Sequence, residues 1–105
     1  SLPTSANQED HVSMATFAAR RLYDMAGNSS AVVAIELLGA AQGIDFQAPL
    51  KTTEKLNKVM TFIRAHVPHY DQDRYFAPDL AKARTWVEQG KFLEWISAES
   101  LYQGL

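Results

Sequence analysis

The sequence predicts an all-α protein, a bundle of about five helices. Apolar residues recur at steps of three and four over most of the 105 residues, which is the period of a helix with one buried face. No stretch of useful length alternates apolar and polar residues as a half-buried strand does. Gly, Asn and Pro interrupt the apolar pattern, as is typical of helix ends. With 47% hydrophobic residues, a chain of this length can bury one modest core.

The first predicted helix starts from Ser5. Ser5 and Gln8 have the spacing of a capping box, in which two side chains satisfy the free amide groups at a helix start. Gly27 and Asn28 are predicted to end this helix. The predicted buried stripe consists of Val12, Ala15, Ala19, Leu22 and Ala26.

The second predicted helix runs from about Ser30 to Gln42 and ends at Gly43. In its segment AVVAIELLGAA, residues 31–41, nine of eleven residues are apolar, and they cover every side of the helix. Such a helix has to be surrounded. Four short helices with one apolar stripe each would not cover it, so we expect a longer chain or other subunits to do so. The alternative is that a small bundle wraps it adequately.

Three shorter helices complete the prediction. The third follows the cap signal of Thr52 and Thr53 and ends at Pro68. The fourth has Pro78 in its first turn, and Gly90 separates it from a short last helix. Their predicted inward positions are Leu56, Val59, Met60, Ile63 and Val67, then Leu80, Ala83 and Val87, and finally Phe92, Leu93 and Ile96.

One charge and two large aromatic residues of these helices carry specific expectations. Glu36 is the one charge in residues 31–41. If it is buried it needs a partner, and Arg20 or Arg21 of the first helix is our candidate. Trp86 and Trp95 are predicted as core or interface residues rather than as platforms for a ligand.

Composition excludes several classes of protein. Ten basic and twelve acidic residues give a net charge of -2 with no long run of either sign, which argues against a nucleic-acid or membrane surface. No apolar stretch has the length of a membrane span. The chain contains no cysteine, which excludes disulfides and fits a reducing cytosol. Because the first residues lack an initiator Met and signal-peptide character, we expect a cut inside a longer sequence.

The first candidate for chemistry is SANQEDHVSM, residues 5–14. Glu9 and Asp10 fall in the first turn of the first predicted helix, where the helix dipole favours carboxylates by roughly 0.3–1 kcal/mol. Gln8 can hydrogen-bond back to the cap, and His11 can be a partly exposed polar residue. Composition alone therefore favours helix capping over catalysis.

The second candidate is a polar connector with four possible ligands of a divalent metal: His66, His69, Asp71 and Asp73. Pro68 breaks the helix between the two histidines, and the spacing matches no known ligand signature. We favour a loop held by an Asp–Arg pair through Arg74, with three aromatic residues packed against the bundle: Tyr70, Tyr75 and Phe76. No phosphate-binding loop, nucleophile elbow or Cys nucleophile is found.

Four segments, SLPTSANQEDHVSM, ARRL, AIELLGAAQGIDF and HYDQDRYFAPD, resemble the C-terminal part of bacterial histidine ammonia-lyases, which belong to the aromatic amino acid lyases. The resemblance covers nearly all of residues 1–105. The run Gln8-Glu9-Asp10-His11 is typical of histidases, whereas plant phenylalanine ammonia-lyases usually have Asn-Gln-Asp without the His. Thr16 and Phe17 stand where relatives tend to have Ala or Pro.

The resemblance implies a mostly helical, cytoplasmic homotetramer that eliminates ammonia from L-histidine to give trans-urocanate. It also implies a methylidene-imidazolone (MIO) group formed from an internal Ala-Ser-Gly, and active sites that draw on more than one subunit. No Ala-Ser-Gly occurs in these 105 residues. We therefore expect residues 1–105 to be the C-terminal helical segment without the MIO-bearing part, and to be inactive alone.

Within this resemblance, Glu9 matches the active-site glutamate and is the candidate catalytic and substrate-binding residue. Gln8 is expected to help bind substrate and His11 to support these contacts from behind; no metal is expected. A carboxylate near a helix N-terminus is biased toward its ionised form, which suits orienting the substrate imidazole better than acting as a strong base. Two alternatives stay open: an independent helical oligomerisation or interaction module, and a related lyase or aminomutase with another aromatic substrate.

Overall fold

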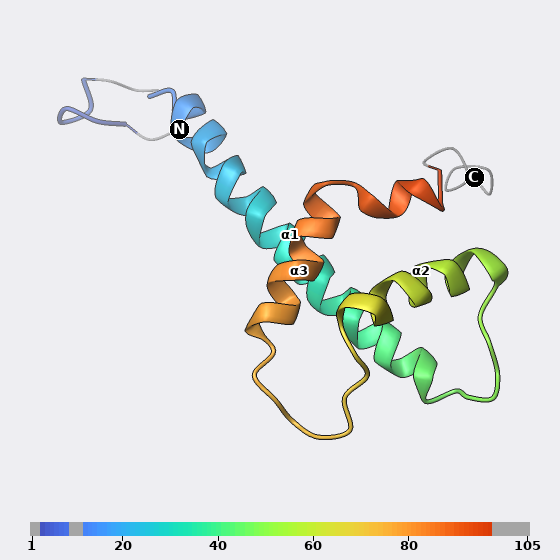
Figure 1. Ribbon diagram of the computed structural model, residues 1–105. Coiled ribbons are helices and arrows are strands. Elements are labelled where there is room, and N and C mark those ends of the chain that lie inside the picture. Colours follow the sequence, from blue (N-terminus) through green and yellow to red (C-terminus); the bar gives the residue numbers. More distant parts are fainter. Residues whose placement is uncertain (1–2, 9–11, 98–105) are drawn as a thin grey trace.

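The structure, a computed structural model, describes residues 3–8 and 12–97. Its elements are three α-helices and one 3₁₀ helix (Figure 1): α1 Ala15–Asp45, α2 Glu54–His66, α3 Ala77–Glu88 and η1 Lys91–Glu94. The predicted all-α class is confirmed, whereas five helices are more than the described residues form.

One long helix, α1, replaces the first two predicted helices. Gly27 and Asn28 lie inside it, because an interior Gly costs a helix only about 1 kcal/mol and no Pro interrupts this stretch. The Ser30 hydroxyl donates to the Ala26 carbonyl at 3.1 Å, so this polar side chain turns back onto its own helix. Gly43 also lies within α1. The predicted stops at these residues are therefore wrong.

The predicted capping box at the start of the first helix is also wrong. Ser5, Ala6 and Asn7 have φ angles of 53°, 55° and 70°, and the Gln8 amide donates to the Ser5 carbonyl at 3.1 Å. This stretch is a left-handed turn, whereas a cap residue adopts extended backbone angles. The helix begins only at Ala15.

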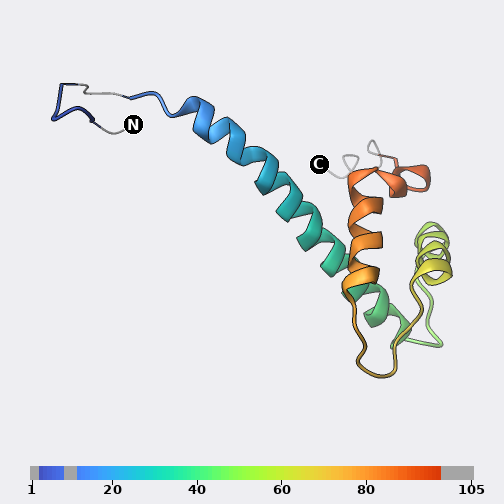
Figure 2. The ribbon, with the colours of Figure 1, turned by 60° about the vertical axis from the view of Figure 1, so that its left-hand side comes forward.

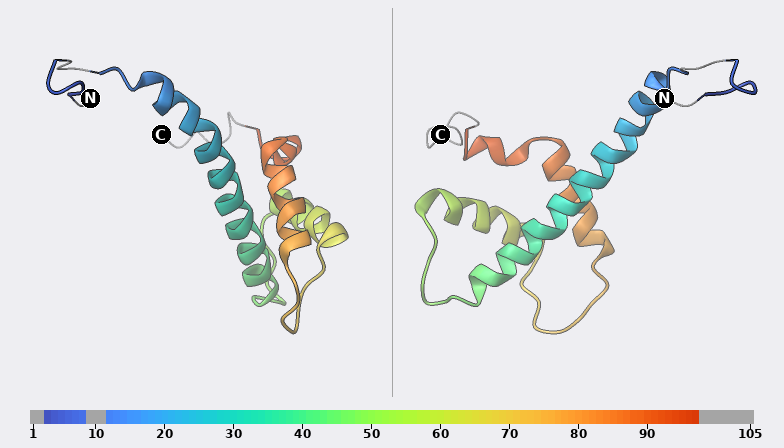
Figure 3. Two further views of the ribbon diagram at one scale, coloured as in Figure 1. Left: turned by 90° about the vertical axis from the view of Figure 1, so that its left-hand side faces the viewer. Right: turned by 180° about the vertical axis from the view of Figure 1, so that it is seen from behind.

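The N-terminal half of α1 extends away from the other helices (Figure 2). With 31 residues, α1 is about 46 Å long, and α3 lies beside only its second half (Figure 3). The stripe predicted to be buried is therefore exposed along the helix, and only Val12 before it is half-buried; the exposed positions are Ala15, Ala19, Leu22 and Ala26.

The core lies where the second half of α1 meets α2 and α3. Small side chains on α1 let α3 approach closely: Ala34 is 1% exposed, and Ala83 opposite it in the core is 0% exposed. Trp86 is buried, and Trp95 packs against the same cluster, which confirms both as core residues. The buried hydrophobic residues are Ala34, Leu38, Ala41, Val59, Ile63, Val67, Ala83 and Trp86.

Local signals place α2, α3 and η1 much as predicted. The Thr53 hydroxyl accepts from the Leu56 amide at 3.4 Å, which caps α2. Pro78 stands in the first turn of α3, and Gly90 adopts φ 65°, a left-handed conformation that ends α3. Most predicted inward positions are buried or partly buried, but Leu56 and Leu93 are exposed.

The all-round apolar stretch of α1 is covered on one side only. Val32 is 63% exposed and Ile35 is 56% exposed. Glu36 is exposed too, and Arg20 lies about 24 Å away along the same helix, so the predicted ion pair does not form. Although α1 is long, no helix among residues 3–8 and 12–97 has the length and apolarity that crossing a bilayer requires.

Candidate functional site

The first candidate site lies at the projecting end of the molecule. Gln8 is exposed and closes the left-handed turn. Glu9 and His11 lie outside the described residues, so their predicted roles stay predictions. Sequence analysis therefore places this site at the opposite end of α1 from the core.

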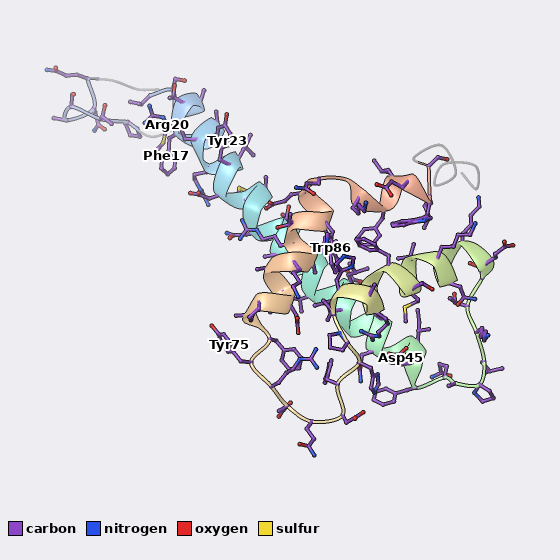
Figure 4. All side chains as sticks on the ribbon, in the orientation of Figure 1. Phe17, Arg20, Tyr23, Asp45, Tyr75 and Trp86 are labelled. Carbon is purple, nitrogen blue, oxygen red and sulfur yellow. The ribbon has the colours of Figure 1, made fainter. Side chains whose placement is uncertain are left out.

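The part of α1 nearest to this candidate carries large exposed side chains. Phe17, Arg20 and Tyr23 stand out from the helix in Figure 4, far from Trp86 and Asp45. Phe17 is 55% exposed and Tyr23 is 85% exposed. The largest hollow, about 570 Å³, lies instead at the other end, between the end of α1 and α2. The described residues at the projecting end thus provide contact surface but no enclosed site.

The second candidate, the polar connector, does not form one site. Nδ1 of His66 lies 2.9 Å from the Phe62 carbonyl oxygen. His69 turns the other way, with Nδ1 2.8 Å from Asp45 Oδ2 and Nε2 3.4 Å from Asp71 Oδ1. Within the described ranges, no group of three or more His, Cys, Asp or Glu side chains is arranged to hold a metal ion.

His69 belongs to a polar cluster of Gln42, Asp45, Arg64 and His69. Arg64 donates to Asp45 Oδ2 through Nε at 2.9 Å and Nη2 at 2.6 Å. Its Nη1 also donates to the Val67 carbonyl at 3.0 Å. The polar cluster thereby joins the end of α1 to the end of α2 and to the connector that follows.

The charge of Asp45 is set by this cluster. Burial alone would raise the pKa of Asp45, but hydrogen bonds from His69 and Arg64 and the charge of Arg64 together hold it below the ordinary value of 3.8. The carboxylate is therefore ionised at neutral pH. With its donors committed to one another, the polar cluster acts as a structural tie rather than a reaction centre.

Sequence reasoning missed this polar cluster because its members come from three segments. Asp45 and Arg64 are 19 positions apart, and no motif connects them. The available signal was weak: Gln42 and Asp45 are three residues apart on one helix, which places two polar side chains on the same face.

A second tie holds the connector between α2 and α3. Arg74 Nη2 donates to Asp79 Oδ2 at 2.9 Å and to the Pro68 carbonyl at 3.0 Å. The predicted Asp–Arg pair is therefore confirmed, with its carboxylate on α3. Tyr70 and Phe76 contact each other edge to face at 4.6 Å, whereas Tyr75 is 81% exposed and does not pack as predicted.

Comparison with known proteins gives one consistent answer. The family described as "Aromatic amino acid lyase" matches residues 1–65. Histidine ammonia-lyase of Desulfotalea psychrophila is 58% identical over 101 residues, 96% of this chain and 20% of the relative. That of Burkholderia ambifaria is 61% identical over 92 residues, 88% of this chain and 18% of the relative. The chain thus spans about a fifth of the length of the curated relatives it matches.

A solved structure matches as well. The crystal structure of histidine ammonia-lyase from Trypanosoma cruzi is similar with a TM-score of 0.78 and 38% sequence identity. The match covers 99% of this chain and 21% of that one. The long projecting helix and the helices packed at its end are therefore an arrangement that also occurs within a larger helical protein.

Proposed function

Because this chain belongs to the aromatic amino acid lyase family, we propose that it is the C-terminal helical part of a histidine ammonia-lyase. The intact enzyme would eliminate ammonia from L-histidine to give trans-urocanate. The observation that carries this proposal is the 58% identity to a histidine ammonia-lyase over 96% of the chain. The Gln8-Glu9-Asp10-His11 run supports histidine over other aromatic amino acids.

The prosthetic group of the family belongs to another part of the enzyme. An MIO group supplies the electrophile in aromatic amino acid lyases. This chain has no Ala-Ser-Gly from which MIO could form, and the described residues near Gln8 are exposed rather than arranged around a site. The residues present therefore do not fit the group, and the role of this chain is to supply side chains to a site completed elsewhere.

Glu9 is the residue that this chain contributes to the proposed site. A carboxylate can accept a hydrogen bond from the imidazole N–H of histidine, which phenylalanine lacks. The helix starts at Ala15, so a dipole argument for an ionised Glu9 no longer applies, and the complementarity of carboxylate and imidazole supports the role instead. Gln8 is proposed to assist binding, and His11 to support these contacts.

The exposed apolar side chains of α1 support the proposed assembly. Leu22 is 60% exposed and Val32 is 63% exposed, and exposed apolar surface of this kind is normally buried against other protein. We propose that the rest of the polypeptide and further subunits cover α1 in a cytoplasmic homotetramer, and that the chain alone is inactive. The same surface favours one rival, a helical oligomerisation module in which Glu9 has no chemical role.

Turnover by the full-length protein that contains these residues separates the two proposals. Glu9→Gln is expected to lower kcat/KM for histidine at least tenfold and to leave little preference for histidine over phenylalanine or tyrosine. Glu54→Gln, which changes an exposed carboxylate at the start of α2, is the matched control and should keep both. A Glu9→Gln enzyme with unchanged preference and a slower proton-transfer step would reject the orienting role. An inactive wild-type protein would favour the oligomerisation module.

A further inference from the structure

His69 has contacts on both ring nitrogens that suit two different protonation states. Nδ1 lies 2.8 Å from Asp45 Oδ2. Nε2 lies 3.3 Å from Gln42 Nε2 and 3.4 Å from Asp71 Oδ1. The side-chain NH₂ of Gln42 can only donate and the carboxylate of Asp71 can only accept. The two neighbours of Nε2 therefore compete for opposite states of the same atom.

The orientation of Gln42 settles which state the described geometry holds. Its Nε2 donates to the Tyr70 carbonyl at 2.9 Å, and its Oε1 faces Arg64 Nη2 at 3.5 Å. The amide is thereby fixed with NH₂ toward His69. In the neutral ring, Nδ1–H donates to Asp45 while Nε2 accepts from Gln42.

We propose that His69 is a proton-operated latch for the connector between α2 and α3. On acidification a proton from solvent binds the lone pair of Nε2, which can then no longer accept from Gln42. The new Nε2–H donates to Asp71, while Nδ1–H stays on Asp45. Protonation therefore fastens Asp71 to the end of α1 through His69, and deprotonation releases it.

The surroundings allow this exchange without disturbing the core. The ionisable groups that face His69 are Asp45 from α1, Arg64 from α2, and Asp71 and Tyr70 from the connector. Asp45 stays tied to Arg64 in both states. The Asp71 side chain is 89% exposed, so it can join or leave the ring at little packing cost. Gln42 keeps its bond to Tyr70 throughout.

The test is a pH titration of the ¹⁵N-histidine-labelled chain by NMR. At high pH, the ring nitrogen shifts of His69 are expected to report a proton on Nδ1 and a bare Nε2. A proton on Nε2 instead would overturn the latch, because Gln42 could then not be its donor.

Two matched variants test the acid state. Asp71→Asn removes the carboxylate that pairs with the protonated ring and should move the His69 titration midpoint down by about 0.2–0.7 pH units. Asp73→Asn, the same change two residues on, should move it by less than about 0.1 unit. Both side chains are exposed, so neither change threatens folding. Equal shifts in the two variants, or no shift in either, would overturn the proposal.

Discussion

The two ends of α1 are built on different principles. The C-terminal end is closed by this chain itself: its apolar side chains meet α2 and α3, and the polar cluster fastens the helix ends. The N-terminal end is a single helix with apolar side chains in solvent. The comparison teaches that the core end carries the stability of this chain, whereas the projecting end carries surface whose value depends on other protein.

Core truncation gives the largest expected contrast between the ends. Ile63 is 1% exposed, and Ile63→Ala is expected to lower the free energy of unfolding by about 2–5 kcal/mol. Leu22 is 60% exposed on the projecting half, and Leu22→Ala should change it by less than about 0.5 kcal/mol. Denaturant titration of both variants measures the difference. Comparable losses would mean that the projecting half is packed in the free chain.

The polar cluster gives a smaller effect that depends on pH. Because the pKa of Asp45 is lower in the folded chain than its ordinary 3.8, its contribution is present above that value and is lost as pH falls through the lower, folded pKa. Asp45→Asn is expected to destabilise by about 1 kcal/mol at pH 7. The gap to the wild type should close in acid well below pH 3.8. A gap that is independent of pH would contradict the ion-pair assignment.

Two glycines of α1 give the smallest effects. Nothing lies within 4 Å of a Cβ placed on Gly39, so Gly39→Ala should stabilise the chain by about 1 kcal/mol through helix propensity. A Cβ on Gly27 would lie 3.0 Å from Arg84 Nη2, the far end of a flexible side chain. Gly27→Ala is therefore expected to gain less, about 0.5 kcal/mol. Thermal unfolding of the two variants compares them, and a larger gain at Gly27 would show that α3 does not restrict α1 there.

The parts of the fold that sequence predicts well depend on strong local signals. Thr53, Pro68 and Pro78 bound α2 and α3 because a side-chain cap and the missing amide of Pro act within a single turn. Gly27 and Asn28 are weaker signals, and the long helix overrides them.

The parts that could not be predicted depend on distant contacts. The pair of Asp45 and Arg64 links segments 19 residues apart, and no periodicity announces it. Burial of the first half of α1 was mispredicted because a helical period shows which side is apolar and not what covers it. Glu9 rests on the resemblance to histidases alone, since physical patterning favoured a helix cap.

A chimeric enzyme tests the central claim most directly. In the histidine ammonia-lyase of Desulfotalea psychrophila, 58% identical over 101 residues, the matching fifth is replaced by this chain, and urocanate formation from L-histidine is measured. The proposed function predicts an active chimera that loses at least nine-tenths of its activity on Glu9→Gln and keeps it on Glu54→Gln. A chimera that folds and assembles like the parent but forms no urocanate, or one indifferent to Glu9→Gln, would contradict it.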